Sequence, residues 1–158
     1  MNRALDFNKG KQNMYDEITQ IICNAREDVD FADFGKGISD EWIELAEKRL
    51  NITFPNSYKW WLHNYRGGKV YGEEIYSIYG LDFDTVVGGD VVYINELSRK
   101  KNSDWEDKLI ICEPNDKLFY FDLSQGIRDG EYPIYEYFTK TLYATNFIEF
   151  LKRRILEV

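Results

Sequence analysis

Few side chains in this sequence are of the kinds that do chemistry near neutral pH. His63 is the only histidine, so any Cys–His or Ser–His mechanism, and any histidine-rich metal site, would depend on it alone. Its position borders the polar face of an expected helix, which favours a surface role over a catalytic one. Cys23 and Cys112 are the only cysteines, too few for a disulfide framework and typical of thiols that pack as small core hydrophobes.

Two acidic runs have calcium-like spacing but lack the rest of a calcium loop. The aspartates within 28–33 fit the first positions of an EF-hand. Its sixth position must be glycine and its twelfth glutamate, whereas this sequence has Asp33 and Ser39 there. The run at 82–84 fails at its fifth position, which is Val86. Both runs are better interpreted as exposed acidic loops.

The sequence contains no phosphate-binding motif. The segment 35–37, Gly-Lys-Gly, leads into Ile38 without the spacing or the preceding strand of a nucleotide-binding loop. Carboxylates are abundant enough to compose a glycosidase-like acid–base pair, but a sequence does not give the separation that such a pair needs. A carboxylate-dependent hydrolase is therefore a disfavoured hypothesis. We predict no catalytic residue, no metal, no cofactor and no enzymatic activity.

Charge and hydropathy restrict the class of partner. The chain has 20 basic and 28 acidic residues, a formal net charge of −8, which argues against direct nucleic-acid binding and fits a basic partner. Net negative charge also keeps small domains soluble, so this point suggests a basic partner without deciding it. The longest apolar runs are far too short to span a membrane, and the N-terminus lacks an apolar signal region. We expect a soluble cytoplasmic protein of unknown oligomeric state.

Aromatic residues are the remaining unusual feature of the composition. The chain has 12 Tyr, 10 Phe and 4 Trp, too many for all of them to be buried. Adjacent helical residues point about 100° apart, so one of Trp60 and Trp61 should be more exposed than the other. Exposed aromatics with an acidic rim are common in protein interfaces. We predict a partner-binding surface formed by Trp60, Tyr71, Glu73, Glu74, Tyr79, Asp82 and Asp84. A competing acidic cluster consists of Asp104, Glu106, Asp107 and Glu113.

The elements that would position these residues begin with helices. Apolar residues at helical spacing predict a helix over about 14–26, after a loose arm over 1–13 and before a polar connector over 27–37. Ser39 is a suitable N-cap for a helix over 40–50. Its inner side should carry Trp42, Leu45, Ala46 and Leu50. Pro55 should lie in the first turn of the next helix, which Gly67-Gly68 should end by adopting positive φ.

The second half of the chain has a β-rich pattern. Turn residues separate short strands expected at 69–72, 74–80, 109–112, 117–122 and 133–137, with a hairpin turn over 113–116. Helices are expected at 90–101 and 145–156. This order predicts a single α+β domain with a mainly antiparallel sheet, flanked by N-terminal helices and a C-terminal helix.

The stretch from Ile38 to Gly68 resembles the signature of the SUKH superfamily, in which a helix with a glutamate is followed by a second helix that starts at proline and ends at a glycine pair. The matching positions are Glu47, Phe54-Pro55, Tyr58-Lys59 and Gly67-Gly68, while Asn51 and Arg66 depart from the usual turn residues. The resemblance covers about 14–156, which implies a SUKH-like domain over 14–158.

The resemblance also implies a function. Bacterial members of the superfamily are immunity proteins encoded beside secreted polymorphic toxins, many with nuclease domains, and related members are cell-wall-synthesis regulators. We therefore expect an immunity protein that binds a cognate, basic toxin domain. The alternative is a regulatory or adaptor module of the same fold without a toxin partner. The pattern specifies the fold more firmly than the partner.

Overall fold

The chain folds into one antiparallel sheet with helices before, between and after its strands. The computed structural model describes the backbone of residues 3–158 and the side chains from residue 9 onward. Within these residues the helices are α1 (Arg3–Asn24), α2 (Asp40–Leu50), α3 (Asn56–Tyr65), α4 (Val91–Lys101), the short 3-10 helix η1 (Ser103–Trp105) and α5 (Phe147–Leu156). The strands are β1 (Val29–Phe31), β2 (Gly68–Val70), β3 (Glu73–Ile75), β4 (Lys108–Cys112), β5 (Phe119–Asp122), β6 (Ile134–Glu136) and β7 (Thr141–Ala144).

The strands of the described chain form one sheet whose spatial order is the chain order, and every neighbouring pair is antiparallel. This meander confirms the predicted α+β class. Ile75 is the only described residue of β3 that pairs with β4, so Ile110, which pairs with Tyr120 of β5, has no strand partner on its β3 side. The buried Asn95 of α4 replaces that partner, because its amide donates to Ile110 O at 3.0 Å and accepts from Ile110 N at 2.7 Å. A helix thus completes the hydrogen bonding of β4.

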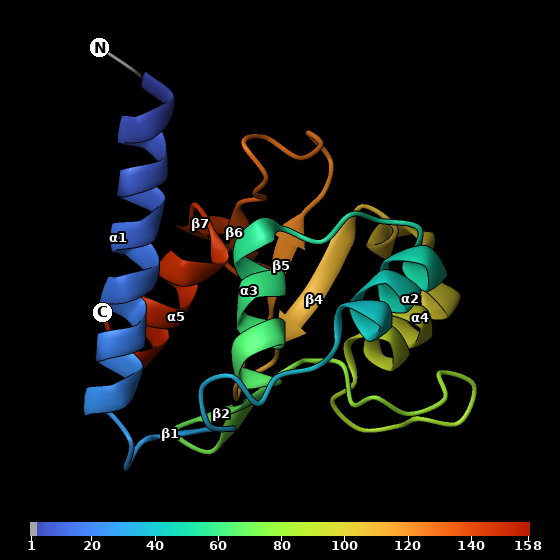
Figure 1. Ribbon diagram of the computed structural model, residues 1–158. Coiled ribbons are helices and arrows are strands. Elements are labelled where there is room, and N and C mark those ends of the chain that lie inside the picture. The colour runs from blue at the N-terminus through green and yellow to red at the C-terminus, as the bar shows by residue number, and fades with distance from the viewer. Residues whose placement is uncertain (1–2) are drawn as a thin grey trace.

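Helices α3 and α5 cover one face of the sheet, and α1 packs against α5 on the outside (Figure 1). Phe119 and Phe121 of β5 point into this layer and are fully buried. Phe121 packs edge-to-face on Tyr58 of α3 with 5.5 Å between ring centroids, and Phe119 packs on Phe150 of α5 at 5.3 Å. Full burial of one such side chain contributes roughly 1.5–3 kcal/mol to folding. This layer is the main core of the protein.

The start of α3 depends on residues that are far away in the sequence. Pro55 occupies the N-cap, directly before the first helical residue rather than within the first turn, and it offers no capping side chain. The carbonyl of Gly130 accepts from Asn56 N at 2.8 Å. The carboxylate of Glu131 accepts from Ser57 N at 3.0 Å and from Ser57 Oγ at 2.7 Å. A distant loop therefore satisfies donors that a helix start leaves free.

The end of α3 confirms the prediction of positive φ at the glycine pair. Gly67 has φ 149° and Gly68 has φ 142°, although the residue directly after the helix is Arg66, with φ 67°. A Cβ on Gly68 would lie 2.0 Å from Asp30 O, and one on Gly67 would lie 2.3 Å from Ser77 Oγ. The pair is required because β1 and the segment after β3 both approach this backbone closely.

The start predicted for the first helix was wrong. Helix α1 begins at Arg3, so residues 3–13 are helical rather than irregular, while residues 1 and 2 of the expected arm lie outside the described residues. The prediction relied on an apolar stripe, and this segment has none. Proline is absent from it, and side-chain pairs such as Gln12–Asp16, at 3.0 Å, support a helix without burial.

The short edge strands were also missed. Strand β1 lies inside the expected polar connector, and β7 lies in a segment for which no element was expected. Strands of three or four residues carry little local pattern, and their pairing with β2 and β6 decides their conformation.

Leu45 was wrongly placed on the inner side of α2. The buried stripe there is Ile43, Ala46 and Leu50, and Leu45 points away from it.

Candidate protein-binding surface

The seven residues predicted for partner binding lie in separate regions of the fold. Trp60 is partly buried between α3 and α1, where its ring stacks on Tyr15 with 4.6 Å between centroids. Tyr71 lies in the turn between β2 and β3 and donates from its hydroxyl to Ile155 O at 2.6 Å. These two aromatic side chains therefore join elements within the protein.

The acidic members of the predicted set also have internal partners. Glu73 forms an ion pair with Arg154 of α5 at 2.7 Å. Glu74 accepts a hydrogen bond from the hydroxyl of Tyr79 at 2.7 Å. Burial and this bond to Glu74 raise the pKa of Tyr79 to about 12. The Tyr79 hydroxyl also accepts from Gly89 N at 2.8 Å, so it holds both ends of the segment between β3 and α4.

Asp82 and Asp84 lie in the same segment, at its exposed turn. The carboxylate of Asp82 accepts from Asp84 N at 2.9 Å, and Asp84 forms an ion pair with Arg49 of α2 at 2.9 Å. Tyr79, Asp82 and Asp84 thus lie in one segment, between β3 and α4, and Glu74 of β3 bonds to Tyr79 of that segment. The other three predicted residues, Trp60, Tyr71 and Glu73, make their contacts elsewhere.

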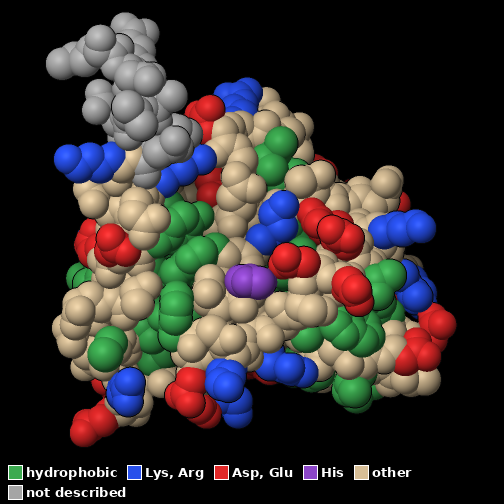
Figure 2. All heavy atoms as spheres, in the orientation of Figure 1, with side chains coloured by type: hydrophobic (Ala, Val, Ile, Leu, Met, Phe, Trp, Pro, Cys, Tyr) green, Lys and Arg blue, Asp and Glu red, His purple; other side chains and the backbone are tan. Residues whose placement is uncertain are grey.

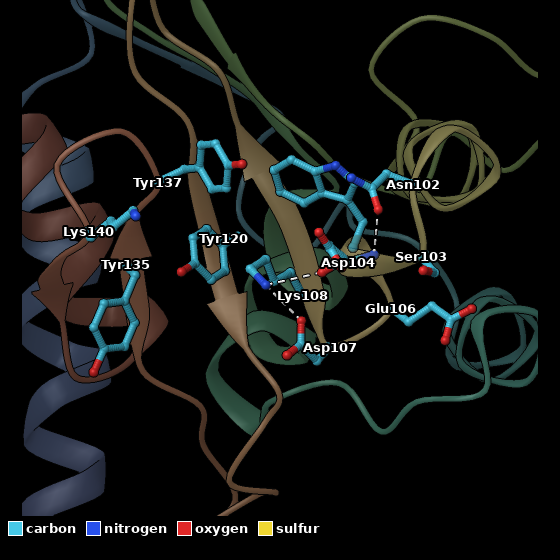
Figure 3. A pocket seen from close by; sticks show the side chains of 11 residues that line it. Asn102, Ser103, Asp104, Glu106, Asp107, Lys108, Tyr120, Tyr135, Tyr137 and Lys140 are labelled. Atoms are coloured by element: carbon cyan, nitrogen blue, oxygen red, sulfur yellow. Dashed lines mark hydrogen bonds and ion pairs between the residues drawn. The ribbon is translucent and has the colours of Figure 1, made fainter.

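The face of the sheet opposite α3 and α5 carries a different set of aromatic residues. Successive strand residues point to opposite faces, so Tyr120 faces away from the core that Phe119 and Phe121 enter. Tyr120 pairs with Tyr135 of β6, and Tyr135 pairs with Leu142 of β7, which is 52% exposed. By this register the three side chains form one row across three strands, and Figure 3 shows the Tyr120 and Tyr135 side chains of that row.

A second group of aromatics borders this row. Trp105 of η1 lies beside Tyr137, with 4.8 Å between ring centroids, and Phe138 at the tip of the β6–β7 hairpin is 63% exposed. Trp105, Tyr137, Tyr120 and Tyr135 line a hollow of about 740 Å³, and Figure 3 shows the three tyrosine side chains of this lining. We call this surface the open face; it comprises Trp105, Tyr120, Tyr135, Tyr137, Phe138 and Leu142.

The exposed aromatic hairpin is held by a buried carboxylate. Glu136 is 5% exposed and accepts hydrogen bonds from the backbone N–H groups of Leu118, Phe138 and Thr139 at 2.9–3.1 Å. Burial disfavours its charge, but these donors outweigh that cost and hold the pKa of Glu136 below its ordinary value. Glu136 therefore fixes the backbone from which Tyr137 and Phe138 project.

One edge of the open face is acidic. Asp104, Glu106 and Asp107 line this edge and are defined here as the acidic rim, whereas Glu113 lies at the β4–β5 turn and accepts from the hydroxyl of Tyr76. Three of the four residues of the competing acidic cluster thus meet at the aromatic hollow. On the opposite, helical face, acidic and basic side chains are interspersed (Figure 2).

Within the hollow the chain holds one of its own cations. The ammonium group of Lys108 donates to the carboxylate of Asp107 at 2.8 Å and to Asp104 O at 3.1 Å, and lies 5.7 Å from the centroid of the Tyr120 ring. Burial works against this charge, but the hydrogen bond to Asp107 and the nearby charges raise the pKa of Lys108. The site therefore stabilises positive charge.

The model of the SMI1 / KNR4 family (SUKH-1) matches residues 37–153. The chain belongs to this family. The structure explains parts of the family signature, because Glu47 accepts from Phe54 N at 2.8 Å and thereby links α2 to the start of α3.

Among the described residues no helix is long and apolar enough to cross a membrane. No group of three or more His, Cys, Asp or Glu side chains there could hold a metal ion.

The alternation of residue types along β5 and β6 already indicates part of the open face. The alternation Phe-Tyr-Phe-Asp over 119–122 and Ile-Tyr-Glu-Tyr over 134–137 places tyrosines on the face opposite the phenylalanine and isoleucine side chains. That alternation alone predicts Tyr120 and Tyr135 on one face. Trp105 lies in η1, which is only three residues long and too short to show a periodic pattern, so only the structure places its side chain on the open face.

Proposed function

We propose that this protein is an immunity protein that binds a basic, nuclease-type toxin domain in the cytoplasm through the open face and blocks its activity. The observation that carries the proposal is an exposed aromatic surface beside an acidic rim, on a chain with a net charge of −8. Stable interfaces combine aromatic anchors with a polar rim. Membership of the SMI1 / KNR4 family supports a protein-binding role.

The two parts of the surface have different kinetic roles. Charges of opposite sign steer two proteins together and raise the association rate, and salt screens this effect. Buried aromatic anchors act mainly on how slowly the complex dissociates. Nuclease domains carry basic surfaces because they bind phosphates, so the acidic rim complements them. Binding would be one to one, with an association rate that falls as salt increases.

Matched double variants test this steering. Asp104→Asn with Glu106→Gln removes two negative charges from the acidic rim. The control, Asp82→Asn with Asp84→Asn, removes two from the segment 76–90 between β3 and α4. We expect the rim variant to associate more slowly at low salt and to show a flatter salt dependence than the control. Stopped-flow mixing with the toxin domain measures both rates. A control variant that slows association more than the rim variant would place the steering surface at the 76–90 segment instead.

The neighbouring gene supplies the partner for this test. An immunity gene should lie directly downstream of a large toxin gene, and co-expression of this protein should rescue cells from growth arrest by the toxin domain. Rescue by the wild-type protein and loss of rescue with Tyr120→Ser and Tyr135→Ser together would support the proposal. A gene neighbourhood without a toxin gene would favour the regulatory or adaptor alternative, and so would a failure to rescue cells from a neighbouring toxin.

A further inference from the structure

The hollow on the open face has the chemistry of a cation site. The rings of Trp105, Tyr137, Tyr120 and Tyr135 line it, with centroids 4.8 Å apart for Trp105–Tyr137 and 6.2 Å apart for the stacked pair Tyr120–Tyr135. Aromatic faces attract cations because of their negative quadrupole, most strongly where water is partly excluded. Tyrosine and tryptophan side chains are therefore suitable walls for a positively charged group.

Lys108 shows how this hollow holds a cation. A carboxylate (Asp107), a backbone carbonyl (Asp104 O) and a ring face (Tyr120) converge on its ammonium group. One intramolecular cation thus already uses part of the hollow.

A second carboxylate of the hollow remains available to a partner. The side chain of Asp104 lines the hollow, and within the described part of the chain it forms no hydrogen bond and no ion pair. Lys140 is the other basic group of the lining, and it lies on the β6–β7 side, away from the acidic rim (Figure 3). The free carboxylate of Asp104 and the rings of Trp105 and Tyr137 therefore line the same hollow.

We propose that the hollow receives an arginine side chain of the protein partner, with its guanidinium group paired to Asp104 and stacked against the aromatic walls. This inference rests on the proposed function, because it names the partner group that the open face recognises. Arginine fits better than lysine because its planar group stacks on rings and donates several hydrogen bonds at once. Arginine is also frequent among the residues that dominate binding energy.

An NMR titration of the full chain tests the site without any toxin. The probe is the capped peptide acetyl-Gly-Arg-Gly-amide, and the matched control carries citrulline, which keeps the shape of arginine but lacks its charge. We expect saturable shifts of the Trp105 indole N–H and of the Tyr120, Tyr135 and Tyr137 ring signals with the arginine peptide alone. Equal shifts with citrulline, or no shift with either peptide, would overturn the inference.

Two variants sharpen the test. Asp104→Asn should lower the affinity for the arginine peptide about threefold, which corresponds to the energy of one exposed ion pair. Asp84→Asn should leave this affinity unchanged. Lys108→Met keeps the apolar stem but removes the resident cation, so it should tighten binding about threefold by freeing Asp107. Thermal unfolding confirms that each variant is folded. Weaker binding to Lys108→Met, or stronger shifts with acetyl-Gly-Glu-Gly-amide, would overturn the inference in favour of an anionic partner group.

The outcome is separable from that of the proposed function. Arginine-specific shifts together with a failure to rescue cells would retain the cation site and reject the immunity role. Rescue together with an absence of arginine-specific shifts would retain the immunity role and reject the arginine site.

Discussion

The two faces of strands β5 and β6 differ in what covers them. On one face Phe119 and Phe121 are fully buried beneath α3 and α5. On the other, Tyr120 and Tyr135 line an open hollow beside acidic side chains. Neighbouring residues of one strand thus have different roles, because successive side chains point to opposite faces of the sheet. One face stabilises the fold and the other is free to bind. Substitutions on the two faces should accordingly separate stability from binding.

The largest expected effect is on the covered face. Phe121→Ala removes a ring that contacts Tyr58 and Phe147, and the resulting cavity should lower the free energy of unfolding by about 3–5 kcal/mol. Urea denaturation followed by circular dichroism measures this loss. A loss below about 1 kcal/mol would mean that the helical layer is not tightly packed on the sheet.

A smaller effect is expected at Glu136, which joins the core to the open face. Glu136→Gln leaves buried N–H donors poorly satisfied and should cost about 1–3 kcal/mol at neutral pH. The pKa of Glu136 is lowered in the folded protein, so its carboxylate stabilises the fold above the ordinary glutamate range, and this contribution is lost as the pH falls through the folded-state pKa. Urea midpoints measured from pH 7 to pH 3 should therefore decline less in Glu136→Gln than in the wild type.

Glu131 should show the opposite pH dependence. Burial raises its pKa, although the hydrogen bonds from Ser57 oppose the shift. Stability from this group is fully present below the unfolded-state pKa and is lost as the pH rises through the folded-state pKa. Glu131→Gln should change stability by less than about 1 kcal/mol at pH 7, because the amide still accepts from Ser57 N. The same urea series should show that the variant gains less stability than the wild type on acidification; a greater gain would contradict the assigned sign.

The smallest effect on stability is expected on the open face. Tyr120→Ser and Tyr135→Ser together should change the free energy of unfolding by less than about 1 kcal/mol, because both side chains are only partly buried. The same denaturation experiment compares them with Phe121→Ala. A loss as large as that of Phe121→Ala would show that the tyrosines belong to the core, and the contrast between the faces would disappear.

Local signals predicted most of the fold. Helix α2 was predicted with the observed bounds, because Ser39, the acidic first turn and the apolar spacing agree. Ser39 makes no side-chain capping bond, so the position was correct but the expected hydrogen bond is absent. Strands β1 and β7 were missed because pairing across the sheet, rather than local preference, makes them extended.

The candidate site was harder to predict for a related reason. Whether a tyrosine binds a partner or its own chain depends on which element lies beside it in space. Tyrosine is a residue type common in interfaces, but the hydroxyl of Tyr79 forms hydrogen bonds with Glu74 and Gly89 of its own chain. Tyr120 lines the hollow and is only partly buried. Alternation predicts the face on which a side chain lies, and only tertiary structure shows what covers that face.

The central claim is that the open face, rather than the helical face, binds the partner. Biolayer interferometry with the basic toxin domain proposed as the partner tests it most directly, using Tyr120→Ser with Tyr135→Ser against Phe34→Ser, which removes an exposed aromatic side chain packed beside α3. We predict that the open-face variant dissociates about 30-fold faster, equivalent to about 2 kcal/mol, and that Phe34→Ser dissociates at the wild-type rate. Unchanged dissociation of the open-face variant, with faster dissociation of Phe34→Ser, would contradict the claim.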